Sequence, residues 1–288
     1  CTMQLARRGY HVTLAEADNK LGGRVLFESG LKGLSAWKRV SDNRIYEIQQ
    51  KNNIEIYKES ELTLSHINEL GINNIFLATG SSWRKDGIGR SRRKPVQGLE
   101  ALHVLTPEEA IKQSPNLSGP IVVYDDEQGY LAGVIADHLS FDEHEVIFIT
   151  PASVVSPWTE STLEQKRIQK ALLVSGVNVI CNKTIDKAEG SNLNLKCVFT
   201  GEISLLKCSS LVMVTERIPN TTLYDQLVEQ ENNTEQGEAK HIQLIGDAES
   251  PGLIADAVFL GHLAAQSFEE PEQEIQKAMF MREMPSLK

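Results

Sequence analysis

Short apolar runs alternate along the chain with longer stretches in which apolar residues recur at helical spacing, and this alternation predicts a parallel α/β fold. The short runs predict strands over 11–15, 54–57, 74–78, 121–124, 145–149, 211–214 and 241–245. The longer stretches predict helices over 1–8, 35–52, 129–139, 162–175 and 251–265. Of the remainder, 81–95 is predicted to be a loop, 177–206 to consist of strands and turns, and the acidic 229–240 to be a surface insertion.

Three of the predicted helices have an apolar face that should be buried against a sheet. The predicted buried positions are Trp37, Val40, Ile45 and Ile48 in 35–52, Leu163, Ile168, Leu172 and Leu173 in 162–175, and Ile254, Val258, Leu260 and Leu263 in 251–265.

Glu16 closes the predicted strand 11–15, and Gly22, Gly23 and Arg24 follow it. In a dinucleotide-binding βαβ unit, an acidic residue at the end of the second strand accepts hydrogen bonds from the ribose hydroxyls of adenosine. The paired glycines would let the backbone approach a ligand without a side chain between them. A surface glutamate followed by a turn is the alternative that these residues leave open.

The Gly-rich phosphate-binding loop that should precede this unit is not in the sequence. A helix over 1–8, then a strand and then Glu16, has the spacing expected immediately after such a loop, and the chain begins with Cys1 rather than Met. We therefore expect the chain to be cut from a longer polypeptide just past the glycines. Because the amides of that loop normally hold the pyrophosphate, we expect this chain alone to bind its nucleotide weakly or not at all.

Two later strands also end in residues suited to a ligand site. Ala78, Thr79 and Gly80 close one strand, and Gly246 and Asp247 close another that precedes a helix. Ligands of open α/β sheets sit at the carboxyl ends of the strands, where Asp247 could accept a hydrogen bond from a ribose or ribitol hydroxyl. A helix N-cap is the alternative role for this aspartate.

The order of these features predicts two nested Rossmann-like, three-layer α/β domains, and 288 residues suffice for two domains. The first, an FAD- or ADP-binding domain, is predicted to be split over 1–104 and 207–288. The second is predicted to be an inserted domain over 105–206 that is related to NAD(P)-binding domains.

The inserted domain lacks the residues that a nicotinamide nucleotide needs. Asp125, Glu127 and Tyr130 occupy the three positions where a working phosphate loop has glycines. Carboxylates there would repel a pyrophosphate, and side chains would block the approach of the backbone. We therefore expect this domain to be a structural relic, and we expect that NAD(P)H does not supply electrons.

Charge and composition exclude several functions. A net charge of −10 argues against nucleic acid, and the basic residues of 84–94 are expected to be a solvated loop. No apolar run is long enough to cross a membrane and no signal peptide is recognisable, so a cytoplasmic protein is expected. The four cysteines form no C-x-x-C pair, which argues against a zinc or dithiol site.

A family resemblance rests on three segments. Residues 245–262 and 78–87 resemble the C-terminal region of trimethylamine dehydrogenase, and 155–165 resembles the related demethylases for dimethylglycine and N-methylproline. The resemblance covers nearly the whole chain and indicates the NADH:flavin oxidoreductase (old yellow enzyme-like) family. It implies an upstream β/α barrel that carries FMN, a 4Fe–4S cluster and all catalytic residues, none of which would lie in this chain.

The same resemblance implies FAD or ADP in the first domain. The matching positions are Glu16, Gly22, Gly23, Gly80, Gly246 and Asp247, with Arg24, Ala78 and Thr79 beside them. Trp83 and Arg217 are included because they follow strands as in the relatives, although a surface salt bridge is an alternative for Arg217. Trp158 and His262 are expected to serve packing.

Three functions remain after these considerations. The first is oxidative demethylation of a small methylated amine by the parent enzyme, which would pass its electrons to an electron-transferring flavoprotein. The second is an NADPH-dependent enzyme similar to 2,4-dienoyl-CoA reductase. The third is a non-catalytic adenine-nucleotide-binding structural module. A homo-oligomer is compatible with each of them, and we expect no turnover by this chain alone.

Overall fold

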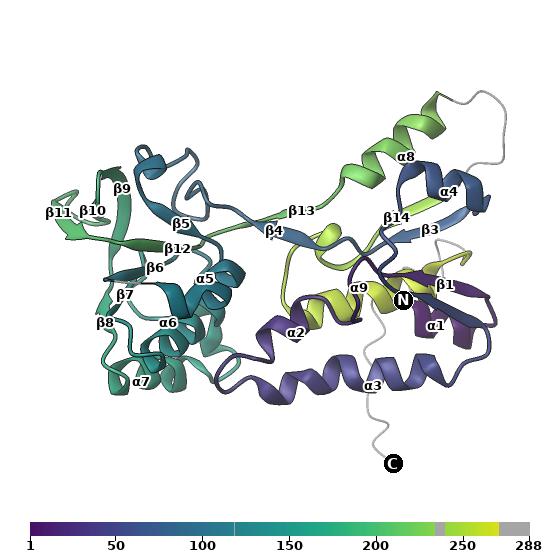
Figure 1. Ribbon diagram of the computed structural model, residues 1–288, viewed down its shortest axis with the longest axis horizontal. Helices are drawn as coiled ribbons and strands as arrows, with labels where there is room; N and C mark the ends of the chain where they lie inside the picture. The colour runs from purple at the N-terminus through teal and green to yellow at the C-terminus, as the bar shows by residue number, and fades with distance from the viewer. Residues whose placement is uncertain (118, 234–239, 271–288) are drawn as a thin grey trace, which may run out of the picture. The chain divides into compact units, whose positions relative to one another are not determined.

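The chain folds into two compact units, one inserted into the other. The computed structural model describes residues 1–117, 119–233 and 240–270 (Figure 1). Unit 1 consists of Cys1–Leu26, Trp37–Ser81 and the described part of Pro219–Lys288. Unit 2 consists of Phe27–Ala36 and Ser82–Ile218. The nested α/β architecture predicted from the sequence is confirmed.

Unit 1 contains two pairs of parallel strands. Its helices are α1 (Thr2–Arg7), α3 (Lys38–Gln49), α4 (Leu64–Leu70), α8 (Thr222–Asn232) and α9 (Ile254–Ser267), with short 3-10 turns η1 (Ser35–Trp37) and η5 (Gly246–Ala248). Its strands are β1 (Val12–Ala15), β2 (Ile54–Tyr57), β3 (Asn74–Leu77) and β14 (His241–Leu244). Among the described residues β1 pairs with β2, and β14 pairs with β3.

Alternate side chains of β3 enter two different cores, as the period of a strand requires. Ile75 and Leu77 pack with Ile67 of α4 and Leu227 of α8. Phe76 points to the other side, where it packs with a cluster from α1, β1 and the end of α9 that includes Leu5, Ala265 and Phe268. Helices therefore cover both sides of this strand pair.

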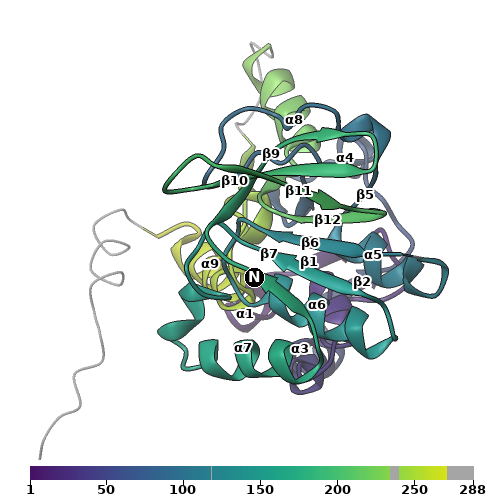
Figure 2. The same ribbon diagram turned by 90° about the vertical axis from the view of Figure 1, so that its left-hand side faces the viewer.

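Unit 2 is built on a five-stranded parallel sheet with the order β5-β12-β6-β7-β8. These strands are His103–Leu105, Ser210–Val214, Ile121–Asp125, Val146–Ile149 and Asn178–Ile180, in that order. All residues of β6, β7 and β12 are buried. Helices α5 (Pro107–Gln113), α6 (Leu131–Phe141) and α7 (Gln165–Val174) cover one face (Figure 2).

A second, antiparallel sheet covers the other face. Its strands are β9 (Lys183–Glu189), β10 (Asn192–Cys197) and β11 (Ile203–Lys207). Ile185, Leu193 and Leu195 of this sheet pack on Tyr124 and Met213 of the parallel sheet. The remaining short elements are α2 (Arg24–Glu28), β4 (Ser81–Trp83), β13 (Arg217–Pro219) and the 3-10 turns η2 (Leu99–Ala101), η3 (Ser114–Asn116) and η4 (Pro157–Glu160).

The units divide the chain at other places than the predicted boundaries of 104/105 and 206/207. Strands β5 and β12 belong to the same sheet as β6, so unit 2 extends outward to Ser82 and Ile218. It also includes Phe27–Ala36, where Leu31 and Leu34 are each 2% exposed. No local pattern in the sequence indicated that this segment packs with unit 2.

The predicted strands are all present, but some helix details were wrong. Helices α4 and α5 were not predicted, although Thr63 and Thr106 each cap their helix in a capping box. The predicted surface insertion 229–240 overlaps α8, and residues 234–239 lie outside the described residues.

The predicted apolar faces were also partly wrong. In α7 the predicted burial of Ile168 and Leu172 is confirmed, whereas Leu173 is 62% exposed and Leu163, which precedes the start of α7 at Gln165, is 89% exposed. In α3 only Ser41 and Ile48 are buried. The buried positions of α9 are Gly261, Ala264 and Ala265, since small residues let this helix approach α1 closely.

Gly98 holds the loop before η2 against β9. Its φ is +81°, and a Cβ there would collide with the backbone carbonyl of Ala188. The amide of Ala188 donates to the Gln97 carbonyl at 2.8 Å. Only glycine therefore lets the two backbones meet at this point.

We predict that Gly98→Ala lowers the free energy of unfolding by about 3 kcal/mol, because backbone must move to admit the methyl group. The matched control is Gly190→Ala, at a φ of +60° with no atom within 4 Å of the added Cβ, which should cost about 1 kcal/mol of backbone strain. Denaturant unfolding of both variants checks this, and equal losses would contradict it.

Candidate nucleotide site

Glu16 lies at the carboxyl end of β1, as the sequence predicted. Its amide donates to the Tyr57 carbonyl at 2.8 Å and its carbonyl accepts from the Ser60 amide at 2.8 Å, which fixes the backbone at this strand end. Its carboxylate oxygen Oε1 accepts from the Asp18 amide at 3.1 Å. The half-buried side chain is thus held at the strand end, where a ribose could reach it.

Gly22 and Gly23 both have positive φ values, of 132° and 51°. A Cβ on Gly22 would lie 3.0 Å from Cγ of Leu26 and 3.3 Å from Cβ of Ser41, so a side chain is excluded there. A Cβ on Gly23 would meet nothing within 4 Å. The turn therefore needs glycine for its backbone conformation, and at Gly22 also for space.

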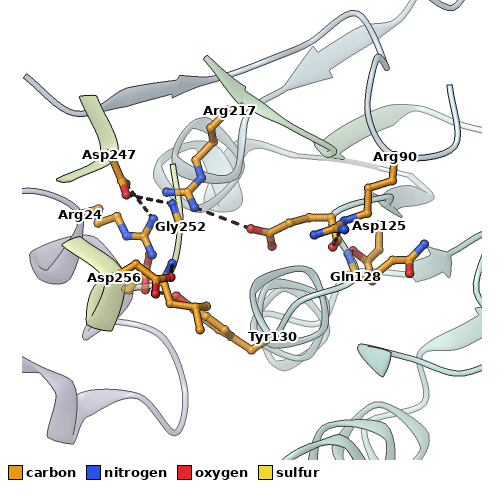
Figure 3. A network of polar contacts seen from close by, with 12 residues as sticks. Arg24, Arg90, Asp125, Gln128, Tyr130, Arg217, Asp247, Gly252 and Asp256 are labelled. Atoms are coloured by element: carbon orange, nitrogen blue, oxygen red, sulfur yellow. Dashed lines mark hydrogen bonds and ion pairs between the residues drawn. The ribbon is translucent and has the colours of Figure 1, made fainter. Parts of the chain in front are cut away.

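Arg24 and Asp247 form an ion pair within unit 1 (Figure 3). Nη1 of Arg24 lies 2.9 Å from Oδ2 of Asp247, and the side chains are 22% and 9% exposed. The other carboxylate oxygen of Asp247 accepts from the Gly252 amide at 3.2 Å. Asp247 therefore binds an arginine that is more than two hundred residues away in the sequence.

Asp247 is not the N-cap of the helix that follows it. It lies within η5, where Gly246 has a φ of +63°. The cap of α9 is Leu253, whose amide donates to Asp256 Oδ2 at 2.6 Å. The alternative role of N-cap that the sequence left open for Asp247 is therefore not found, and Asp256, at the third position of α9, accepts the hydrogen bond from the cap residue.

The turn Ala78–Thr79–Gly80 is tied to Asn220. The Thr79 hydroxyl donates to the Asn220 carbonyl at 2.6 Å, and the Asn220 side-chain amide donates to the Thr79 carbonyl at 3.0 Å. The Asn220 amide also donates to the Gly80 carbonyl at 3.0 Å. Because β3 pairs in parallel with β14, this turn and Gly246 end neighbouring strands. Sequence reasoning missed Asn220, which no motif distinguishes from other polar residues after a strand.

Trp83 and Arg217 belong to unit 2, whereas the other predicted site residues belong to unit 1. The Arg217 guanidinium lies 5.2 Å from the centre of the Trp83 ring and its Nη2 lies 3.8 Å from Glu127 Oε1. Its side chain is 8% exposed, so the alternative of a surface salt bridge is wrong. The Arg217 guanidinium is therefore held in place by the Trp83 ring and by the Glu127 carboxylate.

The packing roles expected for Trp158 and His262 are only partly found. Trp158 is 60% exposed, and the Arg90 guanidinium lies 4.9 Å from its ring centre. His262 is half-buried on α9, where burial lowers the pKa of its imidazole.

The residues in place of the glycines of unit 2 have partners within their own chain. Asp125 is fully buried, and its Oδ1 accepts from the Gln128 amide at 2.7 Å (Figure 3). Its Oδ2 has no partner, and burial raises the pKa of this carboxyl well above its ordinary value. The Tyr130 hydroxyl donates to Glu28 Oε2 at 2.5 Å, and Glu127 faces Arg217.

Other kinds of site are not indicated within the part of the chain that the structure describes. No group of three or more His, Cys, Asp or Glu residues there could hold a metal ion. No helix there is long and apolar enough to span a membrane. All four cysteines are free, and burial raises the pKa of the Cys208 thiol to about 12.

Glycine turns and acidic residues at the carboxyl ends of parallel strands define a protein of the dinucleotide-binding α/β class. Residues 1–259 match the family model described as pyridine nucleotide-disulphide oxidoreductase, and the chain belongs to this family. The matched residues include residues of both units.

Several relatives have much longer chains. Dimethylamine dehydrogenase of Hyphomicrobium sp. (strain x) is 28% identical over 302 residues, which span 96% of this chain and 41% of that protein. Histamine dehydrogenase from Rhizobium sp. 4-9 is 38% identical with a TM-score of 0.90, over 94% of this chain and 42% of its own.

A third relative is the 6-hydroxypseudooxynicotine amine oxidase HisD from Pseudomonas geniculata N1. It is 31% identical with a TM-score of 0.88, over 93% of this chain and 40% of its own. The chain thus spans about two fifths of the length of these relatives. The resemblance to the trimethylamine dehydrogenase branch is confirmed.

We predict that Asp125→Asn makes unit 2 more stable at pH 8 relative to the wild type, and flattens the pH dependence. The folded-state pKa of Asp125 is raised, so the wild type loses stability as pH rises from about 4, the unfolded pKa, toward the folded value. Asparagine keeps the acceptor for Gln128 and cannot ionise. Urea unfolding at pH 5 and pH 8 measures this, and an unchanged pH slope in the variant would contradict it.

Proposed function

We propose that this chain is the nucleotide-binding part of a flavin-dependent amine dehydrogenase or demethylase, and that its unit 1 holds an adenine nucleotide. The observation that carries the proposal is Glu16 at the end of β1, followed by a turn in which Gly22 admits no side chain. A carboxylate at this strand end fits two ribose hydroxyls, and the turn fits a close backbone approach. Three amine-oxidising relatives support the reaction class.

The Arg24–Asp247 pair favours ADP over FAD in this site. Both oxygens of Asp247 already have partners, in Arg24 and the Gly252 amide. A ribitol hydroxyl of FAD would have to share one of these oxygens with the Arg24 guanidinium or the Gly252 amide, which weakens the charge-assisted bond already made there. ADP ends at the second phosphate and makes no such demand, and the cation of Arg24 suits that phosphate.

The greater length of the relatives supports a longer parent polypeptide, and this chain contains no phosphate loop for unit 1. The two strand pairs of unit 1, β1-β2 and β14-β3, are not joined by a further strand among the described residues. Gly22 and Gly23 follow the acidic residue rather than precede it, so they cannot replace a phosphate loop. The chain alone should therefore bind its nucleotide weakly.

In the parent we place FMN and a 4Fe–4S cluster on an N-terminal β/α barrel, together with the substrate pocket. Electrons would leave for an electron-transferring flavoprotein, because unit 2 is unsuited to NAD(P)H. The loop after β6 supports this, since Glu127 adds negative charge where a pyrophosphate would bind, and the side chains of Asp125 and Tyr130 occupy positions where its backbone would have to approach. The same loop disfavours the alternative that the parent is an NADPH-dependent enzyme similar to 2,4-dienoyl-CoA reductase. We place the protein in the cytoplasm, as its free thiols suggest.

A non-catalytic module that binds adenine nucleotide for structure alone is the second candidate. Glu16 and the glycine turn of unit 1 would serve such a module as well, because they would bind the ribose and take no part in catalysis. Reduction of a dye by a methylated amine separates the two candidates: the parent enzyme should show it, while this chain alone should not. Dye reduction by this chain alone would contradict the proposal.

We predict that Glu16→Ala in the parent weakens nucleotide binding roughly 10- to 100-fold, since hydrogen bonds to a charged group are worth about 1.5–3 kcal/mol. The control is Glu55→Ala, which removes an exposed carboxylate from the neighbouring strand β2. Release of the nucleotide by acid and its chromatography measures both occupancy and identity. ADP is expected; recovered FAD would contradict the role of Arg24–Asp247, and equal effects of the two variants would contradict the role of Glu16.

We predict that the parent shows no saturable binding of NADH or NADPH at millimolar concentration, as measured by nucleotide fluorescence. The expected absence follows from the carboxylates at the would-be phosphate loop. Saturable binding would contradict the nucleotide-free role of unit 2 and would favour the reductase reading.

A further inference from the structure

The parallel sheet of unit 2 has one position where a dinucleotide would be expected to bind, which we call the crevice: the carboxyl ends of β6 and β12. From β6 the chain runs outward to β7 and β8, and it returns on the other side at β12, so the strand order reverses between β6 and β12. Ligands of open parallel sheets bind at the carboxyl ends of the strands beside such a reversal. In unit 2, Asp125–Asp126 and Thr215 stand at these two strand ends.

A segment of the chain itself lies at this position. Residues 89–92, which we call the strap, form a turn closed by the Gly89 amide, which donates to the Arg92 carbonyl at 3.0 Å. A Cβ on Gly89 would lie 2.5 Å from Asp126 Oδ2 and 3.2 Å from Thr215 Cβ. The backbone of the strap is therefore in direct contact with both strand ends.

Asp126 binds the strap with both of its carboxylate oxygens. The Ser91 amide donates to Oδ2 at 2.9 Å, and the Ser91 hydroxyl donates to Oδ1. Asp126 is fully buried whereas Ser91 is exposed, so these bonds are partly shielded from water and tie a surface segment to a buried carboxylate.

Two arginines of the strap, Arg90 and Arg92, bind it to neighbouring elements of unit 2. Arg90 donates from Nε to the Glu127 carbonyl at 3.0 Å and lies over the exposed ring of Trp158. Arg92 donates from Nη1 to the Ile185 carbonyl of β9 at 3.0 Å. The strap is thus bound to the loop after β6, to η4 and to β9.

Three backbone amides of the loop between β6 and α6, where a phosphate loop would lie, are also occupied. The amides of Asp126 and Glu127 both donate to the Val214 carbonyl, at 2.9 and 3.0 Å. The Gln128 amide donates to Asp125 Oδ1. A pyrophosphate at the start of α6 would need these donors.

We propose that the strap is a built-in occupant of the unit 2 crevice, and that Asp126 is the positioning residue that keeps it there. Unit 2 then excludes dinucleotides by filling the site with its own chain, in addition to lacking the glycines. The inference rests on the proposed nucleotide-free role of unit 2. Asp126, Ser91 and Gly89 become the residues that determine this exclusion.

Limited trypsin digestion of the full 288-residue chain tests the proposal, because Arg90, Arg92 and Arg93 provide cleavage sites in and next to the strap. We expect the wild type to resist cleavage there and Asp126→Ala to be cut at least tenfold faster. The control is Asp142→Ala, which removes another Ser–Asp hydrogen bond of unit 2, the 2.5 Å bond from Ser114, and should leave the strap protected. Ser91→Ala, which removes the hydroxyl alone, serves if Asp126→Ala does not fold and should give an intermediate rate.

Equal cleavage of Asp126→Ala (or, in its place, Ser91→Ala) and the wild type would overturn the role of Asp126, and so would equal acceleration by Asp142→Ala, which would reveal general destabilisation. A parallel NADH titration of the wild type keeps the two proposals apart. Saturable NADH binding would overturn the nucleotide-free role of unit 2 and the exclusion by the strap. If Asp126→Ala is cleaved as slowly as the wild type and the wild type binds no NADH, only the proposed role of Asp126 in holding the strap is overturned.

Discussion

Burial of parallel strands on both faces is the constraint on which the arrangement of this molecule depends. A parallel sheet needs crossover connections that cover its faces, and the strands between them become continuous apolar runs. In unit 2 this applies to β6, β7 and β12, which are buried throughout between α5–α7 and the sheet β9–β11. Since all strands run in one direction, the loops that follow them meet at one edge. Every candidate site in the chain lies at such an edge.

The two units use this edge in opposite ways. In unit 1, glycine turns leave backbone accessible beside Glu16, and the charged residues Arg24 and Asp247 offset each other. In unit 2, Asp125 and Glu127 replace two of the glycines. Asp125 is buried and caps the next turn, and its neighbour Asp126 binds the strap. A buried carboxyl with one oxygen unsatisfied costs stability at neutral pH. Its presence fits a site that has lost its anionic ligand.

These differences lead to one consistent account of the proposed function. In this proposal an adenine nucleotide held by unit 1 would serve structure rather than hydride transfer, because the strap is proposed to exclude a nicotinamide nucleotide from unit 2. Catalysis would then belong to the polypeptide that makes up the rest of the length seen in the amine-oxidising relatives.

The sequence alone determined the strands, the nested order of the units and the identity of most strand-end residues. Each of these depends on local patterns: an apolar run such as 121–124, a carboxylate after it, or a pair of glycines. The apolar periodicity around Leu163 misled, because a backbone φ of +62° at that residue keeps it outside α7 and leaves it exposed.

Only the tertiary structure decided which charges meet. Arg24 and Asp247, or Ser91 and Asp126, are distant in sequence, and nothing near either member of a pair specifies its partner. The same holds for Phe27–Ala36, whose buried leucines contribute to unit 2 although the chain on both sides belongs to unit 1. Local propensity acts over a few residues, whereas ion pairs and buried contacts depend on distances in space, which are set when the sheets and helices pack.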